Sequence, residues 1–353
     1  MTAQTAPDVS LLFRDEPLAQ PAWTLFHSNQ TAWKAIFELC EEARHTLALE
    51  QYIFSPDGIG GRLLDLLISR AKAGVDVRMV LDGFGSSRVP ASEKGRALVK
   101  AGGRIAMYNG ARDVFFHPYG HLHRLHRKSV LADRRRLILG GCCYHDRMCD
   151  WRDTMVSIEG APVPAAVIAM DVLWRRVTTP RTPQAEPAHS PPIAPGDWAY
   201  MVSTPYKPAQ REFYRTLIGV LSHAQHSITL TTPYFVPDIA FRRALNGALK
   251  RGVQVRLIIP HPEKNDHPVW NVPARLFAGR LAERGAEIWL YRPAMMHAKI
   301  AVVDDDWASV GSTNLDLLSF ALNLENGIVS RARDFHGALL EQLDRDIAES
   351  VRL

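Results

Sequence analysis

The sequence predicts two duplicated α/β domains that pack about a pseudo-two-fold axis and share one active site. Three observations support this prediction. The chain has 353 residues, which exceeds the usual size of a single domain and fits two. Short motifs recur in the two halves, the most informative of them at a constant offset of 171 residues. Within each half, short β-branched runs alternate with stretches of helical period, as in α/β sheets.

The duplication is visible along most of the chain. Besides the motif described below, three pairs of segments match between the halves. They are AKAGVDVR (71–78) with LKRGVQVR (249–256), LVKAGGRIAMY (98–108) with LAERGAEIWLY (281–291), and YIFSPD (52–57) with YFVPD (234–238).

A proline-rich stretch separates the two halves. Residues 178–196 contain six prolines and almost no apolar side chains, which is typical of a stiff, extended linker. We therefore expect an N-terminal domain over residues 1–177 and a C-terminal domain over residues 197–353.

Individual elements can be placed within these domains. Residues 227–236 and 253–260 are β-branched runs that predict strands. Residues 60–74 and 240–252 have helical periodicity, and each ends at a glycine, as helices often do.

Composition excludes several classes of protein. Apolar residues make up 46% and charged residues 22%, which argues against a disordered or fibrous chain. No apolar run reaches the ~20 residues that span a bilayer, and the first residues lack the pattern of a cleaved secretion signal. The four cysteines are too few and too bunched for a disulfide framework, which favours a reducing, cytosolic compartment. A net charge of +5 suits an anionic partner.

The strongest motif is His-x-Lys-x4-Asp, which occurs once in each half. Residues two apart in a strand point the same way, so each histidine shares a face with its lysine, while the aspartate falls at the strand end. The residues are His126, Lys128 and Asp133 in HRKSVLAD, and His297, Lys299 and Asp304 in HAKIAVVD.

Two such motifs facing each other have the chemistry that a phosphodiester requires. Cations can hold the non-bridging oxygens, one neutral imidazole can attack phosphorus, and the opposite imidazolium can protonate the leaving oxygen. The lysines supply the positive charge, so this chemistry needs no metal. The ordinary alternative, two β-hairpins with incidental His and Lys residues, is weakened by the repeat and by the chain's preference for Arg over Lys, 33 to 9.

These motifs resemble the phospholipase D superfamily. So do the glycines that follow them, the GSTN at 311–314 and the Asn-x-Glu that ends at Glu325. The blocks TTPYFVPD (231–238), WRDTMVSIEG (151–160) and 311–329 are similar to bacterial cardiolipin synthases, and most similar to the short kind without N-terminal membrane helices. The resemblance implies phosphatidyl transfer between phospholipids through a phosphohistidine, with no metal or organic cofactor.

The resemblance also suggests roles for the motif residues. We expect His126 to be the nucleophile and His297 the general acid, because superfamily members more often attack with the N-terminal copy. Lys128 and Lys299 would hold the phosphate oxygens. We interpret Asp133 and Asp304, although they belong to the catalytic motif, as structural acids that brace the strand ends.

Further residues are candidates for supporting roles. Ser312 and Asn314 are expected to donate hydrogen bonds to the phosphate, although they would also be ordinary polar turn residues. Asp153 lies 27 residues after His126, and Glu325 lies 28 after His297. This near-equivalence predicts that the two carboxylates orient the imidazoles across the domain interface.

The first half departs from the family pattern after Gly141. Cys143, a poor hydrogen-bond donor, stands where the second half has Asn314. Leu318 stands where relatives commonly carry arginine. We therefore expect an asymmetric phosphate cradle that depends mainly on the C-terminal half.

Three other clusters allow two interpretations each. The histidines 117, 121 and 123 before His126 have spacings that can bind zinc, but the nearby cysteines lack a paired pattern and an incidental cluster is favoured. Phe115, Phe116 and Tyr119 suit either a core or a lipid entrance. The three arginines at 134–136 suit either a solvated turn or a contact for anionic lipid.

The leading functional prediction is a peripheral phosphatidyltransferase on the cytoplasmic face of the cell membrane. Its substrates would be phosphatidylglycerol or a related lipid, with cardiolipin as the product; the sequence leaves the oligomeric state open. A phospholipase D that hydrolyses lipid is the nearest alternative. A nuclease would also suit the basic charge, but the chain lacks a dense mixed aromatic and basic stretch. A catalytically inactive scaffold is disfavoured because both His-Lys pairs are intact.

Overall fold

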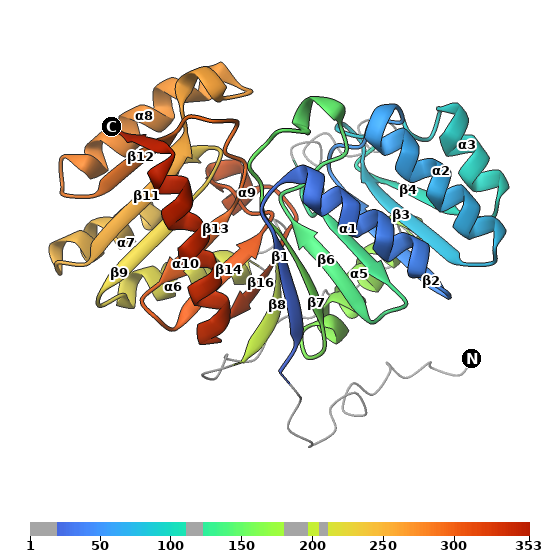
Figure 1. The fold of residues 1–353 in the computed structure, drawn as a ribbon, viewed down its shortest axis with the longest axis horizontal. Coiled ribbons are helices and arrows are strands. Elements are labelled where there is room, and N and C mark those ends of the chain that lie inside the picture. The colour runs from blue at the N-terminus through green and yellow to red at the C-terminus, as the bar shows by residue number, and fades with distance from the viewer. Residues whose placement is uncertain (1–19, 111–122, 180–196, 205–210) are drawn as a thin grey trace.

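The computed structural model describes residues 20–110, 123–179, 197–204 and 211–353. Two large sheets lie side by side, and helices cover their outer faces (Figure 1). The expected linker at 178–196 and the aromatic residues at 115–119 fall almost entirely outside these ranges, so their interpretation stays a prediction.

The first sheet has the order β1-β7-β6-β5-β2-β3-β4. β2, β3 and β4 run parallel and are joined by helices, whereas β5, β6 and β7 form an antiparallel meander. Its elements are β1 Ala22–Phe26, α1 Asn29–Glu42, β2 Thr46–Gln51, α2 Gly58–Lys72, β3 Asp76–Asp82, α3 Glu93–Lys100, β4 Arg104–Tyr108, β5 Ser129–Ala132, β6 Arg136–Gly140, β7 Met155–Glu159 and α5 Val163–Thr178.

The second sheet repeats this order and adds one edge strand: β17-β12-β11-β9-β13-β14-β16-β8. A separate pair of short strands, β10 and β15, lies beside it. The elements are β8 Trp198–Ser203, α6 Glu212–His223, β9 Ser227–Thr231, β10 Phe235–Val236, α7 Ile239–Lys250, β11 Gln254–Pro260, α8 Asn271–Ala282, β12 Glu287–Tyr291, β13 Ile300–Val303, β14 Trp307–Gly311, β15 Leu315–Asp316, α9 Leu317–Ala321, β16 Glu325–Ser330, α10 Arg333–Ala348 and β17 Ser350–Arg352.

Local signals in the sequence explain where the helices begin and end. The Ser28 side chain accepts a hydrogen bond from the third residue of its helix, and Asp238 does the same for α7. Gly74 and Gly252, which match in the repeat, follow α2 and α7 with φ values of +90° and +85°. This left-handed conformation favours glycine, so the repeated glycine ends the same helix in both halves. The four elements predicted above are confirmed, with 227–236 divided into β9 and β10.

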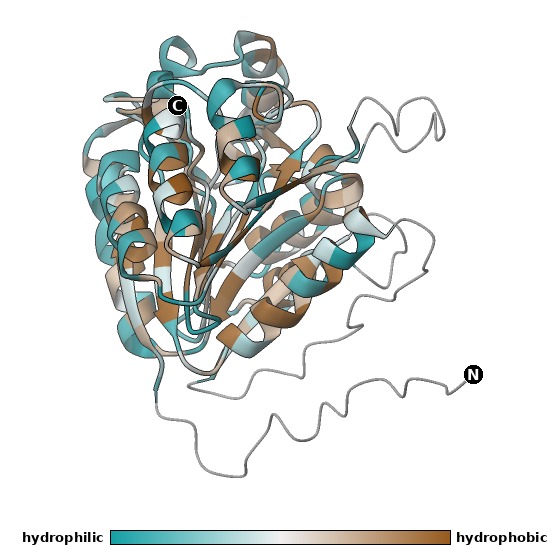
Figure 2. Cartoon of the chain, turned by 90° about the vertical axis from the view of Figure 1, so that its right-hand side faces the viewer, coloured by the Kyte–Doolittle hydropathy of each residue, from teal (hydrophilic) through white to brown (hydrophobic). Residues whose placement is uncertain are grey.

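Three large apolar clusters make up most of the core. One lies under the helices of each sheet, and the third lies between the sheets and includes residues of α5 and α10. In Figure 2 the strands and the inner helix faces are largely apolar, and hydrophilic residues cover the outer helix surfaces. A buried ion pair also joins the halves: Arg152 Nη2 lies 2.6 Å from the Asp346 carboxylate on α10. The two sheets therefore meet through a common core, which fixes the edges that carry the two motifs relative to each other.

Candidate active site

The two motif histidines stand at the same edge of the molecule. His126 lies shortly before β5, and His297 before β13; both strands run antiparallel to the parallel strands of their sheets. The histidines therefore lie where the parallel strands β2, β3, β9 and β11 end. Ligands bind outside the carboxyl ends of parallel strands in many α/β proteins.

Backbone pairing across the halves fixes both histidines. His126 N donates to Leu324 O at 2.9 Å, and His297 N donates to Arg152 O at 2.7 Å. Each motif thus begins beside the segment of the opposite half that carries Glu325 or Asp153. The backbone hydrogen bond from the histidine to the opposite half thus recurs on both sides, as a pseudo-two-fold arrangement requires.

Each imidazole is held by a carboxylate from the other half. His126 Nδ1 lies 2.9 Å from Glu325 Oε1 and 3.0 Å from Oε2, and His297 Nδ1 lies 2.6 Å from Asp153 Oδ2. An ionised carboxylate only accepts hydrogen bonds, so Nδ1 carries the proton in both rings. The Nε2 atom of a neutral ring then has a free lone pair, which is the form a nucleophile or general base needs.

The carboxylates are themselves buried and held by hydrogen bonds. Ser312 Oγ donates to Glu325 Oε2, and Thr154 N donates to Asp153 Oδ1 at 2.8 Å. Asn326 N in turn donates to Ser312 Oγ at 3.0 Å. In this structure the Ser312 hydroxyl therefore donates its hydrogen bond to Glu325. A hydrogen bond from Ser312 to phosphate stays a prediction.

The other predicted phosphate donor is also held locally. The Asn314 backbone N–H donates to Ser319 Oγ at 3.2 Å, and its buried Oδ1 accepts no hydrogen bond from the described residues. Its role at the phosphate is likewise a prediction.

The two lysines are almost fully buried beneath the histidines. Lys128 is 0% exposed and Lys299 4%, and each Nζ donates to the backbone carbonyl of the histidine two residues before it. The two ammonium groups interact across the interface: the charge of Lys128 lowers the pKa of Lys299, and the charge of Lys299 lowers that of His126. The two lysines and two histidines of the motifs therefore belong to one electrostatic site.

Burial sets the protonation states of this site. It lowers the pKa of His297 to about 4, helped by Lys299 and opposed by Asp153, and it lowers the pKa of His126 in spite of Glu325. Burial also lowers the pKa of Lys299 to about 8. By itself burial would raise the pKa of Asp153, but the charges of His297 and Lys299 hold it below its usual value. Near neutral pH both imidazoles are therefore neutral and both carboxylates are ionised, beside the two buried lysines.

Sequence reasoning missed the aromatic side chains beside the imidazoles. The Tyr52 ring centroid lies 5.1 Å from that of His126, and the Trp151 centroid 4.9 Å from that of His297. Both rings reduce the contact of the histidines with water, which contributes to their lowered pKa. Tyr52 begins the repeated segment YIFSPD, so the duplication contained a signal for it.

The motif aspartates follow β5 and β13, at the ends of these strands that are far from the histidines. Asp133 accepts hydrogen bonds from the backbone N–H groups of residues 44, 45 and 46 at 2.7–2.9 Å. Asp304 does the same for residues 225, 226 and 227 at 2.8–3.0 Å. Both adopt positive φ, near +50°. These contacts support the interpretation of both residues as structural acids.

We expect Asp133→Ala and Asp304→Ala each to lower the free energy of unfolding by about 1–3 kcal/mol, since each leaves three backbone donors without their acceptor. These hydrogen bonds hold the pKa of both carboxyls below the usual value. The stabilisation is therefore present above about pH 4 and lost as pH falls through the folded-state pKa. Urea unfolding measures this effect, with Asp→Asn as the conservative control. A large loss of turnover in a stably folded variant would contradict the structural interpretation.

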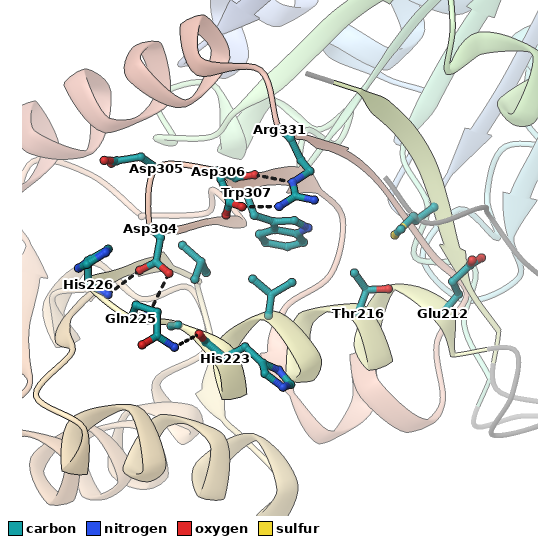
Figure 3. A pocket seen from close by; sticks show the side chains of 14 residues that line it. Glu212, Thr216, His223, Gln225, His226, Asp304, Asp305, Asp306, Trp307 and Arg331 are labelled. Carbon is teal, nitrogen blue, oxygen red and sulfur yellow. Dashed lines mark hydrogen bonds and ion pairs between the residues drawn. The ribbon is translucent and has the colours of Figure 1, made fainter. Parts of the chain in front are cut away.

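Two other features lie away from the histidines. A surface cavity of about 770 Å³ adjoins Asp304 at the far end of β13, between α6 and Trp307 (Figure 3). Arg134 and Arg135 occupy the turn between β5 and β6, and Arg136 begins β6, also at that far edge. Each is in an ion pair, with Asp171, Glu159 or Glu42. The structure thus favours a paired turn over a lipid contact for this cluster.

The described cysteines and histidines give no sign of a metal. All four cysteines are free thiols. Among the described residues, no group of three or more His, Cys, Asp or Glu side chains is placed to hold an ion. Histidines 117 and 121 of the candidate zinc cluster lie outside the described ranges.

Comparison with known proteins agrees with this geometry. The family model described as "Cardiolipin synthase, PLD-like domain" matches residues 36–169 and again residues 217–347. Cardiolipin synthase B of Escherichia coli K12 is 30% identical over 92% of this chain and 80% of its own length. The probable cardiolipin synthase YwiE of Bacillus subtilis is 31% identical over 92% of this chain, which spans 66% of that protein.

Solved structures show the same fold at low identity. Phosphatidylserine synthase from Haemophilus influenzae superposes with a TM-score of 0.75 at 14% identity, over 94% of this chain and 87% of that one. Polyphosphate kinase from Porphyromonas gingivalis gives a TM-score of 0.62 at 13% identity, over 100% of this chain and 52% of that one. At these identities the likeness establishes the fold alone.

Proposed function

Because this chain belongs to the phospholipase D-like family of cardiolipin synthases, we propose that it is a phosphatidyltransferase that joins two phosphatidylglycerols into cardiolipin and glycerol. The observation that carries the proposal is the crosswise pairing of each imidazole with a carboxylate from the other half. It leaves two Nε2 atoms, one on each side, available to a single phosphorus. The relatives from Escherichia coli and Bacillus subtilis are named cardiolipin synthase and probable cardiolipin synthase.

In the first step His126 attacks. The Nε2 lone pair forms a bond to phosphorus, the bond from phosphorus to the glycerol oxygen breaks, and His297 Nε2–H gives its proton to that oxygen. The buried ammonium groups of Lys128 and Lys299 hold the non-bridging oxygens, where charge develops in the transition state. Glu325 stabilises the charge that the His126 ring acquires.

The charge balance of the site explains how His297 can serve as an acid. Its pKa is low in the unliganded site because of burial and the neighbouring ammonium group. A bound phosphodiester adds one negative charge beside Lys299 and so offsets that repulsion, which raises the pKa of His297. When substrate binds, His297 therefore takes up a proton from solvent at Nε2.

In the second step the hydroxyl of another lipid takes the place of the departed glycerol. His297, now neutral, accepts the proton of that hydroxyl, its oxygen bonds to phosphorus, and the bond from phosphorus to His126 breaks. Water in the same position would give phosphatidic acid instead. Transfer therefore requires that lipid rather than water occupies the acceptor position.

A product analysis tests the proposal. The purified chain is incubated with phosphatidylglycerol vesicles and, separately, with single-stranded DNA, with His126→Ala as the control for contaminants. Cardiolipin with an equimolar amount of glycerol is the expected result. Phosphatidic acid as the main product would identify a hydrolase, and DNA cleavage without lipid turnover would identify a nuclease. No turnover of either would favour an inactive protein.

We expect the rate of transfer to depend on the charge of Lys299. Because burial lowers its pKa to about 8, the ammonium form is present below that pH and is lost as pH rises through it. The value of kcat/KM, which reports the free enzyme, already declines above about pH 4 as protonated His297 is lost, and we expect this decline to become steeper above about pH 8. A Lys299→Met variant should lose most activity and also this steepening. A wild-type profile that does not become steeper up to pH 10 would contradict the assignment.

We also place the protein, as part of this proposal, on the cytoplasmic face of a membrane as a peripheral enzyme. Among the described residues, the structure contains no helix with the length and apolar character needed to cross a bilayer.

A further inference from the structure

Large apolar side chains are exposed mainly at one edge of the molecule. Nine of the described ones are exposed, and all except Val99 and Leu353 belong to segments that follow the carboxyl ends of β3, β9, β11 or β14. We call these seven the apolar rim; they are Phe84, Ile239, Val269, Val272, Leu276, Leu317 and Leu318, with exposures from 45% to 76%.

This edge is the one at which the candidate active site lies. Phe84 follows β3 in the first half, whereas Val269 and Val272 follow β11 at the start of α8 in the second. Leu317 and Leu318 begin α9, directly after the short strand β15. Because His126 and His297 also lie at these strand ends, the rim is contributed by both halves around the motif histidines. Figure 1 shows α8 on the upper side of the second half, with α9 close to the junction.

The exposed face of α8 is not explained by the fold. Its buried residues are Ala274, Ala278 and Leu281, while Val272 and Leu276 are 76% and 52% exposed, one helical turn apart. Isolated exposed apolar residues are common, but a group of seven confined to one edge indicates a surface that contacts something apolar.

Charge on the same segment indicates what that surface contacts. Lys264 and Arg275 are exposed and neither forms an ion pair with any described residue, whereas the exposed acid Glu263 of the same segment lies 3.7 Å from His261. By contrast, the arginines at 134–136, at the opposite edge, are all paired with carboxylates. Unpaired cations beside exposed aliphatic side chains match the level at which anionic headgroups meet acyl chains. A second protein covering this edge would also block the candidate active site, whereas a lipid surface would supply it.

We propose that the apolar rim inserts into the surface of an anionic bilayer, with Lys264 and Arg275 at the level of the lipid phosphates. The proposal rests on the lipid substrates of the proposed function, and it assigns docking to the edge that carries the motif histidines and not to the arginine turn. A phosphatidyl headgroup then meets His126 and His297 without leaving the bilayer.

A vesicle-binding experiment tests the proposal. The variant Val269→Ser, Val272→Ser, Leu276→Ser changes only exposed side chains, and its thermal unfolding should match that of the wild type. Binding is measured by flotation with vesicles of phosphatidylglycerol and phosphatidylcholine, and with phosphatidylcholine alone. We expect at least a tenfold loss of binding to the anionic vesicles, and weaker binding of all forms to the neutral ones. Equal binding by the triple variant would overturn the proposal.

Two matched controls and one activity measurement make the result specific. Val99→Ser changes an apolar residue outside the rim, and Arg134→Ala, Arg135→Ala, Arg136→Ala removes the paired turn; both should bind as the wild type does. Loss of binding only in the arginine variant would assign docking to the other edge. If gel filtration with light scattering shows a wild-type dimer that the triple serine variant loses, the rim is an interface between copies and the proposal fails.

The triple variant should turn over monomeric, short-chain phosphatidylglycerol at the wild-type rate, since its substitutions lie outside the catalytic groups. Loss of that activity would overturn a pure docking role. Wild-type vesicle binding without any lipid turnover would contradict the proposed function and leave the docking surface in place.

Discussion

The variant His126→Ala is expected to lose turnover by more than about 10⁴-fold, because the nucleophile of a covalent mechanism cannot be replaced by the remaining groups. His297→Ala is expected to lose about 10²–10⁴-fold with phosphatidylglycerol, which is the usual contribution of a general acid. A substrate with a nitrophenolate leaving group separates the two roles, since that group departs without a proton. With it, the His297→Ala variant should release one equivalent of nitrophenolate in a burst, and the His126→Ala variant none.

Mass spectrometry of the quenched burst locates the covalent intermediate. We expect the phosphatidyl group on His126, with its neighbour Lys128 intact as an internal control for labelling chemistry. A label on His297 would reverse the two assignments while leaving the mechanism in place. Absence of a label with normal product formation would remove the covalent intermediate altogether.

Much of this site could be predicted because the chain is duplicated. The repeat at an offset of 171 residues predicts that both motifs lie at equivalent places in equivalent sheets, and the two strand orders match with one additional strand. The distances in sequence from His126 to Asp153 and from His297 to Glu325 predict equivalent positions for the carboxylates. A two-fold axis that brings the histidines together also brings each carboxylate to the opposite ring, which is the pairing the structure shows.

Other features depend on contacts that no local pattern contains. The sequence places three arginines in a turn, but which edge the turn occupies depends on strand direction, and their partners come from α1, β7 and α5. The buried pair of Arg152 with Asp346 joins residues 194 apart in the chain. The position of Trp151 beside His297 requires both halves to be packed. Tertiary packing, and not propensity, decides each of these contacts.

The crosswise carboxylates should also be separable by kinetics. Glu325→Gln keeps the size of the side chain but allows an amide N–H to face His126 Nδ1, which favours the tautomer with its proton on Nε2. That tautomer has no lone pair directed at phosphorus. We therefore expect formation of the phosphohistidine to slow on the order of 10²–10⁴-fold, with cooperative unfolding retained because the substitution conserves volume.

Asp153→Asn is the matched variant on the other side. Since Asp153 orients the proposed acid, its loss should slow release of glycerol but leave the nitrophenolate burst close to that of the wild type. Glu325→Gln should slow that burst, because attack itself is affected. The activated substrate should therefore restore the burst rate of Asp153→Asn but not that of Glu325→Gln. A merely structural role for either carboxylate would not produce this difference. Equal rescue of both by the activated substrate would show that neither carboxylate sets the tautomer of a nucleophile. Rescue of Glu325→Gln alone would place attack on the His297 side.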